Sequence, residues 1–244
     1  MAINLVIQPH LPVIILITAM IAVFVFIAYG KLKKFDPLDE PKGLVLLCIM
    51  LVEWIDGMVK EIVSEDWVEK LGPFIGSIAA YILLANYIGL LGFDNPTLNL
   101  SCTLAITLVC WILFQATDIK YKGAGGYIKS YFQPIFLFVI SNVFSALTPL
   151  ISMSMRLFGN ILSGSIIMSL MYSATGALSA KLFPFLGGID IIGPIFGSVL
   201  HLYFDLFSGF LQMYLFIMLT MVFIGTRIPD EVKNKSLTQK KEGE

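Results

Sequence analysis

The sequence predicts an all-α integral membrane protein, and three observations support this class. Of the 244 residues, 57% are hydrophobic and only 14% are charged, whereas a soluble domain carries about 25% charged residues. Five apolar segments reach the roughly 17–25 residues that a helix needs to cross the hydrocarbon core. The alternating ten-residue segments typical of an outer-membrane barrel are not seen in the sequence. The chain 1–244 is therefore expected to form a single membrane domain with five crossing helices and one surface helix.

The first crossing is predicted at 11–29, and the basic run "KLKK" (31–34) follows it. The next apolar segment, 43–63, reads "GLVLLCIMLVEWIDGMVKEIV" and carries four charged residues in its second half: Glu53, Asp56, Lys60 and Glu61. Such a segment is typical of an amphipathic helix that lies at the membrane surface with its apolar face down. We therefore count 43–63 as a surface helix and not as a crossing.

Two crossings of ordinary length are predicted at 74–92 and 100–117, and two longer ones at 135–175 and 191–225. At 1.5 Å per residue the longer two would extend about 60 Å and 50 Å, against a hydrocarbon core of about 30 Å. They are expected to be bent or strongly tilted, and Pro149 allows a bend or a break in the first. Tilts average only about 20°, so a partner surface is the simplest cause of such a geometry.

Lysine clusters predict the orientation of the chain, because cytoplasmic loops carry an excess of lysine and arginine. Lysines gather in 31–34, in 118–129 and in the tail 227–244. The loop 92–99 and the residues before the first crossing carry neither lysine nor arginine. Five crossings with the N-terminus outside and the C-terminus in the cytoplasm satisfy all of these clusters.

Polar side chains recur at helical spacing along both long segments. The first segment places Ser152, Arg156, Asn160 and Ser163 on one helix face, and the second places His201, Asp205, Ser208 and Gln212 on one face. Ser165 and Ser169 lie on the side of the first helix opposite Arg156. Polar groups in lipid are costly and are rarely left there without a role. The two faces therefore predict functional sites.

Arg156 is the most informative of these residues. An arginine at the bilayer centre costs about 2.5–3.5 kcal/mol on insertion scales, and it cannot escape by losing its proton. It could reach the interface, pair structurally with Asp205, or act on a partner, and the small and polar residues around it favour the last role. His201 could be a hydrogen-bonded interior residue or part of a proton relay. Asp205 is a plausible ion-handling group, because a carboxylate in apolar surroundings either becomes neutral or finds a partner. Lys181 and Asp190 are interpreted as solvated residues of the outer loop.

The residues that carry a family resemblance are "RLFGNILSG" (156–164) and, some fifty residues later, "LQMYLFIMLTMVFI" (211–224). Together they resemble subunit a of the F-type ATP synthase. Three upstream segments extend the likeness in the same order: "LVEWIDGMVKEIV" (51–63), "LLANYIGLLG" (83–92) and "IKYKGAGGYIK" (119–129). The resemblance covers nearly everything from about residue 42 to residue 228.

The resemblance implies an ion-translocating stator subunit of the ATP synthase membrane sector. In that family, two long, strongly tilted helices form a hairpin against a rotating ring of c subunits, and two offset half-channels reach the ring carboxylates. Arg156 matches the arginine that separates the half-channels, which couple proton or Na⁺ flow to rotation and ATP synthesis. Asn160 and Gln212 match polar positions beside the arginine, and Asn86 matches one that lines the outer half-channel.

Two positions depart from the family pattern. Ser165 stands where many members carry glutamate or histidine, and Asp205 stands where histidine or glutamate is common. One ionisable group of that outer pair is missing, which leaves a simple two-residue proton relay in doubt. Hydroxyls with one carboxylate could conduct protons through water or admit hydrated Na⁺, and the sequence leaves both open.

The remaining expectations concern partners, cofactors and location. The resemblance implies the c-ring, the peripheral stalk of subunit b and, indirectly, the F1 sector as partners, in a lipid bilayer that is a bacterial plasma membrane. No cofactor, metal or catalytic residue is expected, because "KGAGG" (122–126) lacks the closing Gly-Lys-Ser/Thr of a phosphate-binding loop. The net charge of −1 gives no reason to expect nucleic-acid binding. The main alternative is a secondary transporter with Arg156 as a midplane anion-binding residue, although no internal repeat supports it.

Overall fold

The computed structural model describes residues 10–36, 40–91, 93, 95–133, 136–182, 184, 190 and 192–229. Every regular element within these residues is helical, which confirms the predicted all-α class. Five helical stretches are long and apolar enough to cross a membrane, as predicted: Leu11–Leu32, Glu65–Leu91, Leu100–Tyr131, Phe136–Leu182 and Ile192–Gly225. The tail expected at 227–244 lies outside the described residues from residue 230 onward.

The helices follow one another in a simple order. The described residues contain seven α-helices: α1 His10–Leu32, α2 Leu44–Ile62, α3 Val68–Tyr87, α4 Leu100–Tyr131, α5 Val139–Leu182, α6 Ile192–His201 and α7 Ser208–Gly225. Short 3-10 turns lie between them, at Glu65–Trp67 (η1), Ile88–Leu91 (η2), Pro96–Leu98 (η3) and Phe136–Phe138 (η4). A π-helical turn, η6 (Leu202–Phe207), joins α6 directly to α7.

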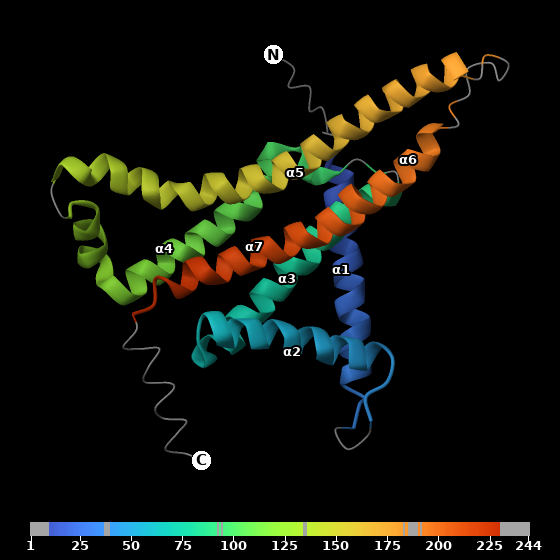
Figure 1. The fold of residues 1–244 in the computed structure, drawn as a ribbon. Coiled ribbons are helices and arrows are strands. Elements are labelled where there is room, and N and C mark those ends of the chain that lie inside the picture. The colour runs from blue at the N-terminus through green and yellow to red at the C-terminus, as the bar shows by residue number, and fades with distance from the viewer. Residues whose placement is uncertain are drawn as a thin grey trace, which may run out of the picture.

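The helices are not arranged as a parallel bundle. Figure 1 shows α1 upright, α2 lying across its lower end, and α5 and the α6–α7 rod running strongly inclined to α1. The 23 residues of α1 extend about 35 Å, close to the hydrocarbon thickness, whereas the 44 residues of α5 extend about 66 Å. Only an inclined path keeps so long an apolar helix within the membrane, and α5 remains helical through Pro149.

The buried core lies where α2, α3, α4, α5 and α7 meet. Its fully buried side chains include Val59, Leu71, Ile75, Ile82, Phe114, Leu157, Phe216, Ile217, Met221 and Ile224. Gly225 permits a close approach to the backbone of α2, because a Cβ there would lie 2.7 Å from the backbone oxygen of Ile62. Small residues of this kind let membrane helices pack at short distance. This core fixes α7 against α2 and α3.

Hydrogen bonds between side chains and neighbouring helices add to this packing. The Trp111 indole donates to the backbone oxygen of Ala146 at 2.7 Å, and the hydroxyls of Thr103 and Ser154 lie 3.2 Å apart. Both contacts join α4 to α5. The α4 segment then turns at Gly123, whose φ of 70° lies in the left-handed region that glycine tolerates.

Asp190 fastens the end of α5 to the start of α6. Its carboxylate accepts hydrogen bonds from the Thr175 hydroxyl at 2.9 Å, the Ser179 hydroxyl at 2.8 Å and the Gly193 backbone N–H at 2.8 Å. The interpretation of Asp190 as a merely solvated residue is therefore wrong. The Gly193 N–H, followed by the two hydroxyls, lowers the pKa of this carboxyl below its usual value.

We expect Asp190→Ala to loosen this end of the hairpin at neutral pH. Because the pKa is lower in the folded protein than the unfolded value of about 3.9, the charged carboxylate stabilises the fold above that value. This stabilisation is lost as the pH falls through the folded pKa. Hydrogen exchange of the amides at the start of α6 should be several-fold faster in the variant at pH 7, and the difference should shrink under acid. Lys181→Gln, at the exposed end of α5, is the matched control. Equal exchange in Asp190→Ala and wild type at pH 7 would contradict the clamp.

Candidate functional site

A cavity of about 330 Å³ lies between the end of α3, the middle of α5 and the junction of α6 with α7. Five of the seven residues selected from the sequence line it: Asn86, Asn160, Ser165, His201 and Asp205. We call it the outer cavity, because the predicted orientation places it toward the outside. These residues come from three separate parts of the chain, and the fold brings them together.

Two hydrogen bonds hold the walls of the outer cavity in place. The Ser208 hydroxyl donates to Asn160 Oδ1 at 2.9 Å and joins α7 to α5. The Asn86 side-chain amide donates to the Gly209 backbone oxygen at 3.2 Å and joins α3 to α7. Gly209 allows this approach, because a Cβ there would lie 3.1 Å from the Asn86 Cβ. Asn86 Oδ1 is buried with no hydrogen-bond partner among the described residues, so it offers an acceptor for water or a proton donor.

His201 and Asp205 form the ionisable pair of the outer cavity. Nδ1 of His201 lies 2.5 Å from Oδ2 of Asp205, and the side chains are 45% and 30% exposed. His201 ends α6 and Asp205 lies within the π-helical turn η6. A π-helical turn inside an α-helix often marks a functional position. An imidazole and a carboxylate at this distance can hold one proton between them and pass it on.

Arg156 is partly buried on α5, one helical turn before Asn160. Among the described residues it has neither a hydrogen bond nor an ion pair, and Asp205 is paired with His201 instead. The alternative of a structural Arg156–Asp205 pair is therefore wrong. The guanidinium remains available for a carboxylate of another chain.

The register of the hairpin locates Gln212. Asn160 lies opposite Ser208, and Gly164 lies against Phe204, so α5 and the α6–α7 rod run antiparallel in steps of four residues. Extended by one further step, this register would pair Arg156 with Gln212. Gln212 is 4% exposed, and its Nε2 has no hydrogen-bond partner within the described part of the chain. Arg156 and Gln212 do not line the outer cavity; they follow one turn beyond it.

Several residues of the outer cavity were not selected from the sequence, among them Asn95, Phe204 and Gly209. Asn95 precedes Pro96, and its Oδ1 accepts a hydrogen bond from the Thr97 hydroxyl at 3.1 Å. An asparagine beside a proline, in a loop without lysine or arginine, was a usable signal for this position. Phe204 and Gly209 carry no such signal, because their residue types do not distinguish them from the other apolar and small residues of the same helical segment.

The outer cavity offers proton donors and acceptors, and no arrangement for metal catalysis. Within the described residues, no group of three or more His, Cys, Asp or Glu side chains is placed to hold a metal ion. Amide, hydroxyl, imidazole and carboxylate groups suit the passage of water and protons. Asn160, one of the lining residues, lies one helical turn after Arg156 on α5.

Comparison with known proteins agrees with the resemblance in the sequence. A family model described as "ATP synthase A chain" matches residues 12–225, which is most of the chain. The matched range includes every residue selected for the site.

Three relatives, each named ATP synthase subunit a, illustrate the similarity. The protein of Mycoplasma pneumoniae is 33% identical over 221 residues, which cover 84% of this chain and 74% of the relative. The protein of Bacillus pumilus is 31% identical over 194 residues, which cover 74% of this chain and 79% of the relative. The protein of Staphylococcus aureus is 32% identical over 197 residues, which cover 74% of this chain and 77% of the relative. The similarity therefore extends over most of each protein.

Proposed function

The chain belongs to the ATP synthase A chain family, and from this premise we propose that it is the ion-translocating stator subunit of the ATP synthase membrane sector. It provides two offset half-channels to the carboxylates of a c-ring, and Arg156 separates them. Ion flow through these paths is coupled to rotation of the ring and to ATP synthesis in the attached catalytic sector. The chain itself is a non-catalytic subunit.

The unpaired state of Arg156 carries this proposal. A buried or membrane-embedded guanidinium without a partner is unfavourable, and proteins retain it only where it serves a function. No described residue supplies a carboxylate to Arg156. A ring of c subunits, each carrying one carboxylate, supplies that partner repeatedly as it turns.

We propose the outer cavity as the outer half-channel. Asn86, Asn160 and Ser165 line its wall with groups that can order water, and His201 with Asp205 supplies the ionisable step. The family pattern has a second ionisable group at the position of Ser165. In this chain His201 supplies that group from one turn before Asp205. The imidazole–carboxylate pair favours protons over Na⁺ as the coupling ion, because Na⁺ prefers oxygen ligands alone.

The physics of the ring explains why Arg156 stands beside this path. A neutral, ion-loaded carboxylate can rotate through lipid, whereas a charged one meets a large desolvation penalty. A fixed guanidinium lowers the affinity of the arriving carboxylate for its proton and so drives release into one half-channel. It also repels a cation that would pass directly from one half-channel to the other. Gln212, which the extended register of the hairpin would pair with Arg156, could hold the guanidinium or the carboxylate by its free amide.

The remaining parts of the proposal concern the assembly and its membrane. We propose the c-ring, the peripheral stalk of subunit b and, through it, the F1 sector as partners. The membrane is the bacterial plasma membrane, with the N-terminus outside and the C-terminus in the cytoplasm. Figure 1 shows α5 and the α6–α7 rod strongly inclined to α1 and α2 lying across the lower end of α1. We propose that α5, α6 and α7 form the tilted hairpin against the ring and that α2 lies at the membrane surface.

Purification of the tagged chain in mild detergent tests this function. We expect it to come away with a ring of small hairpin proteins, whereas a secondary transporter would come away alone. Gly159→Trp should abolish the association, because Gly159 lies on the Arg156 face and a Cβ there meets nothing within 4 Å of this chain. Its bulk would therefore obstruct only a neighbouring chain.

Gly30→Trp is the matched control, since a Cβ at Gly30 in α1 also meets nothing within 4 Å. This variant should retain the ring. Recovery of the ring in equal amount with Gly159→Trp, or its absence from the wild-type preparation, would overturn the proposed function.

A further inference from the structure

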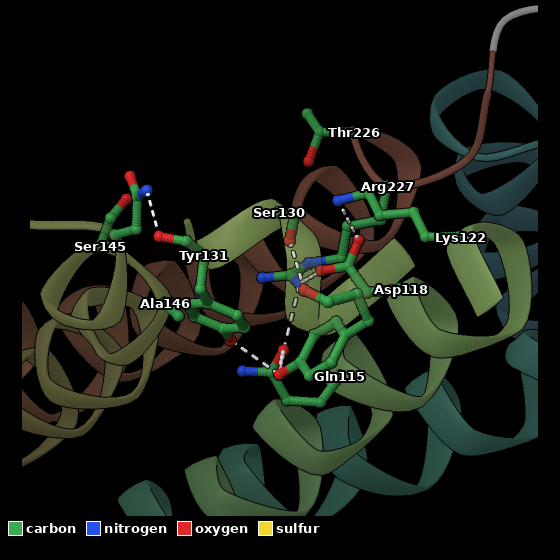
Figure 2. A pocket seen from close by; sticks show the side chains of 11 residues that line it. Gln115, Asp118, Lys122, Ser130, Tyr131, Ser145, Ala146, Thr226 and Arg227 are labelled. Carbon is green, nitrogen blue, oxygen red and sulfur yellow. Dashed lines mark hydrogen bonds and ion pairs between the residues drawn. The ribbon is translucent and has the colours of Figure 1, made fainter. Parts of the chain in front are cut away.

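The structure assigns a second binding site, for the phosphate group of an anionic lipid headgroup, to a cavity of about 400 Å³ at the opposite end of the hairpin. This inner cavity lies between the second half of α4, the start of α5 and the end of α7, as Figure 2 shows. It shares no residue with the outer cavity. The inference goes beyond the proposed ion path and does not depend on it.

Two cations and one carboxylate make the inner cavity electropositive. A guanidinium N–H of Arg227 donates to Asp118 Oδ2, and the Lys122 ammonium lies 2.9 Å from Asp118 Oδ1 (Figure 2). The Asp118 and Arg227 side chains are 9% and 15% exposed, whereas Lys122 is 47% exposed and lies toward the opening. One positive charge therefore has no counter-charge within the cavity. An anion bound there would balance it.

The inner cavity also has a donor without an acceptor. Gln115 is 7% exposed, and its Oε1 accepts a hydrogen bond from the Tyr127 hydroxyl at 3.2 Å. Its Nε2 has no hydrogen-bond partner among the described residues. The other half of this amide is thus a buried N–H₂ that lines a cavity with excess positive charge. A phosphate oxygen is an acceptor that would satisfy it, and the phosphate charge would balance the excess positive charge of the cavity.

The surroundings favour a lipid over free phosphate as the source of this group. Exposed apolar residues lie in sequence between the cavity residues Tyr131 and Asn142: Phe132, Phe136, Leu137 and Ile140, of which Leu137 is 84% exposed. These side chains offer an apolar surface for acyl chains in the part of the chain that leads from one wall of the inner cavity to the other. Lysines 120 and 129 flank the cavity in sequence, on the side that the lysine pattern assigns to the cytoplasm. Basic pockets between membrane helices on that side bind anionic headgroups.

The test uses the whole purified complex and measures lipid binding directly. Complexes stripped in detergent are titrated with phosphatidylglycerol or phosphatidylcholine, and bound lipid is counted by native mass spectrometry. Lys122→Gln should weaken the tightest phosphatidylglycerol site about fivefold, which corresponds to one lost contact between a basic residue and an anionic lipid. Gln115→Leu should weaken it as well, and neither should alter phosphatidylcholine binding. Lys34→Gln is the matched control, with the same charge change in an exposed lysine outside the cavity.

Three results would overturn the proposal. One is equal phosphatidylglycerol binding by wild type, Lys122→Gln and Gln115→Leu in complexes of normal subunit composition. Another is displacement of the bound lipid by an equimolar amount of inorganic phosphate, which would assign the pocket to a free anion. The third is loss of ATP-driven pumping in Lys122→Gln with unchanged lipid binding, which would make the inner cavity part of the ion path.

Discussion

Inverted membrane vesicles that carry the whole complex with Arg156→Ala are expected to build no ion gradient on addition of ATP. Arg156 has no hydrogen-bond or ion-pair partner among the described residues, so its removal breaks no such contact within them. What disappears is the positive charge that lowers the affinity of each arriving ring carboxylate for its ion. The loaded carboxylate would then pass without release, and ATP hydrolysis would no longer drive transport. Gradient formation is followed with a fluorescent pH indicator and normalised to the amount of assembled complex.

Arg156→Lys is expected to lose most of the activity as well. A lysine carries the same charge, but it can lose its proton when it is desolvated, whereas arginine stays charged. Lys181→Gln changes one charge at the exposed outer end of the same helix and should pump at the wild-type rate. If Arg156→Ala pumps as fast as wild type, the arginine is structural and the separation of the half-channels must be assigned elsewhere.

The fold class was predictable because it depends on composition and segment length. A chain with 57% hydrophobic residues and five long apolar segments has no other stable solution than membrane-spanning helices. The polar faces were predictable for a related reason: Asn160, Asp205 and their neighbours stand out against an apolar background, so helical spacing alone groups them. Asn86 was selected only through the family resemblance, and the fold brings it beside Gly209 across more than a hundred residues.

The details that depend on local backbone geometry or on tertiary contacts were not predictable. The π-helical turn Leu202–Phe207 inserts into a run whose hydrophobic pattern is that of an ordinary helix. Asp190 looked like a loop residue, because nothing in the sequence announces that Thr175 and Ser179 lie within hydrogen-bond distance of it. The Asp118–Arg227 pair joins residues that are 109 positions apart, and no pattern in the sequence links them. Each of these contacts forms only once the tertiary packing is in place.

Asp205→Ala is expected to have the second-largest effect, a loss of roughly a hundredfold in the rate of ATP-driven proton pumping. Proton transfer by a positioned acid or base contributes about 10²–10⁴-fold in rate, and Asp205 is the carboxylate of the outer cavity. His201→Ala should slow pumping less, since water in the cavity can reach Asp205 without the imidazole. Asp205→Glu keeps the carboxylate and should retain measurable transport. Ser208→Ala, which removes a hydroxyl one turn away, is the control for local disturbance of the hairpin.

The double variant separates a relay from a structural pair. If His201 and Asp205 act in series on one proton path, the double variant should pump no more slowly than Asp205→Ala alone. If their 2.5 Å contact only fixes the turn between α6 and α7, each single variant should lower the thermal stability of the complex as much as the other. Pumping would then follow stability and not the presence of the carboxylate. The transported ion is identified by adding a protonophore or Na⁺ to the wild-type vesicles. We expect the protonophore to abolish the gradient and Na⁺ to leave the pumping rate unchanged. The reason is that an imidazole–carboxylate pair transfers protons and provides no oxygen cage for Na⁺.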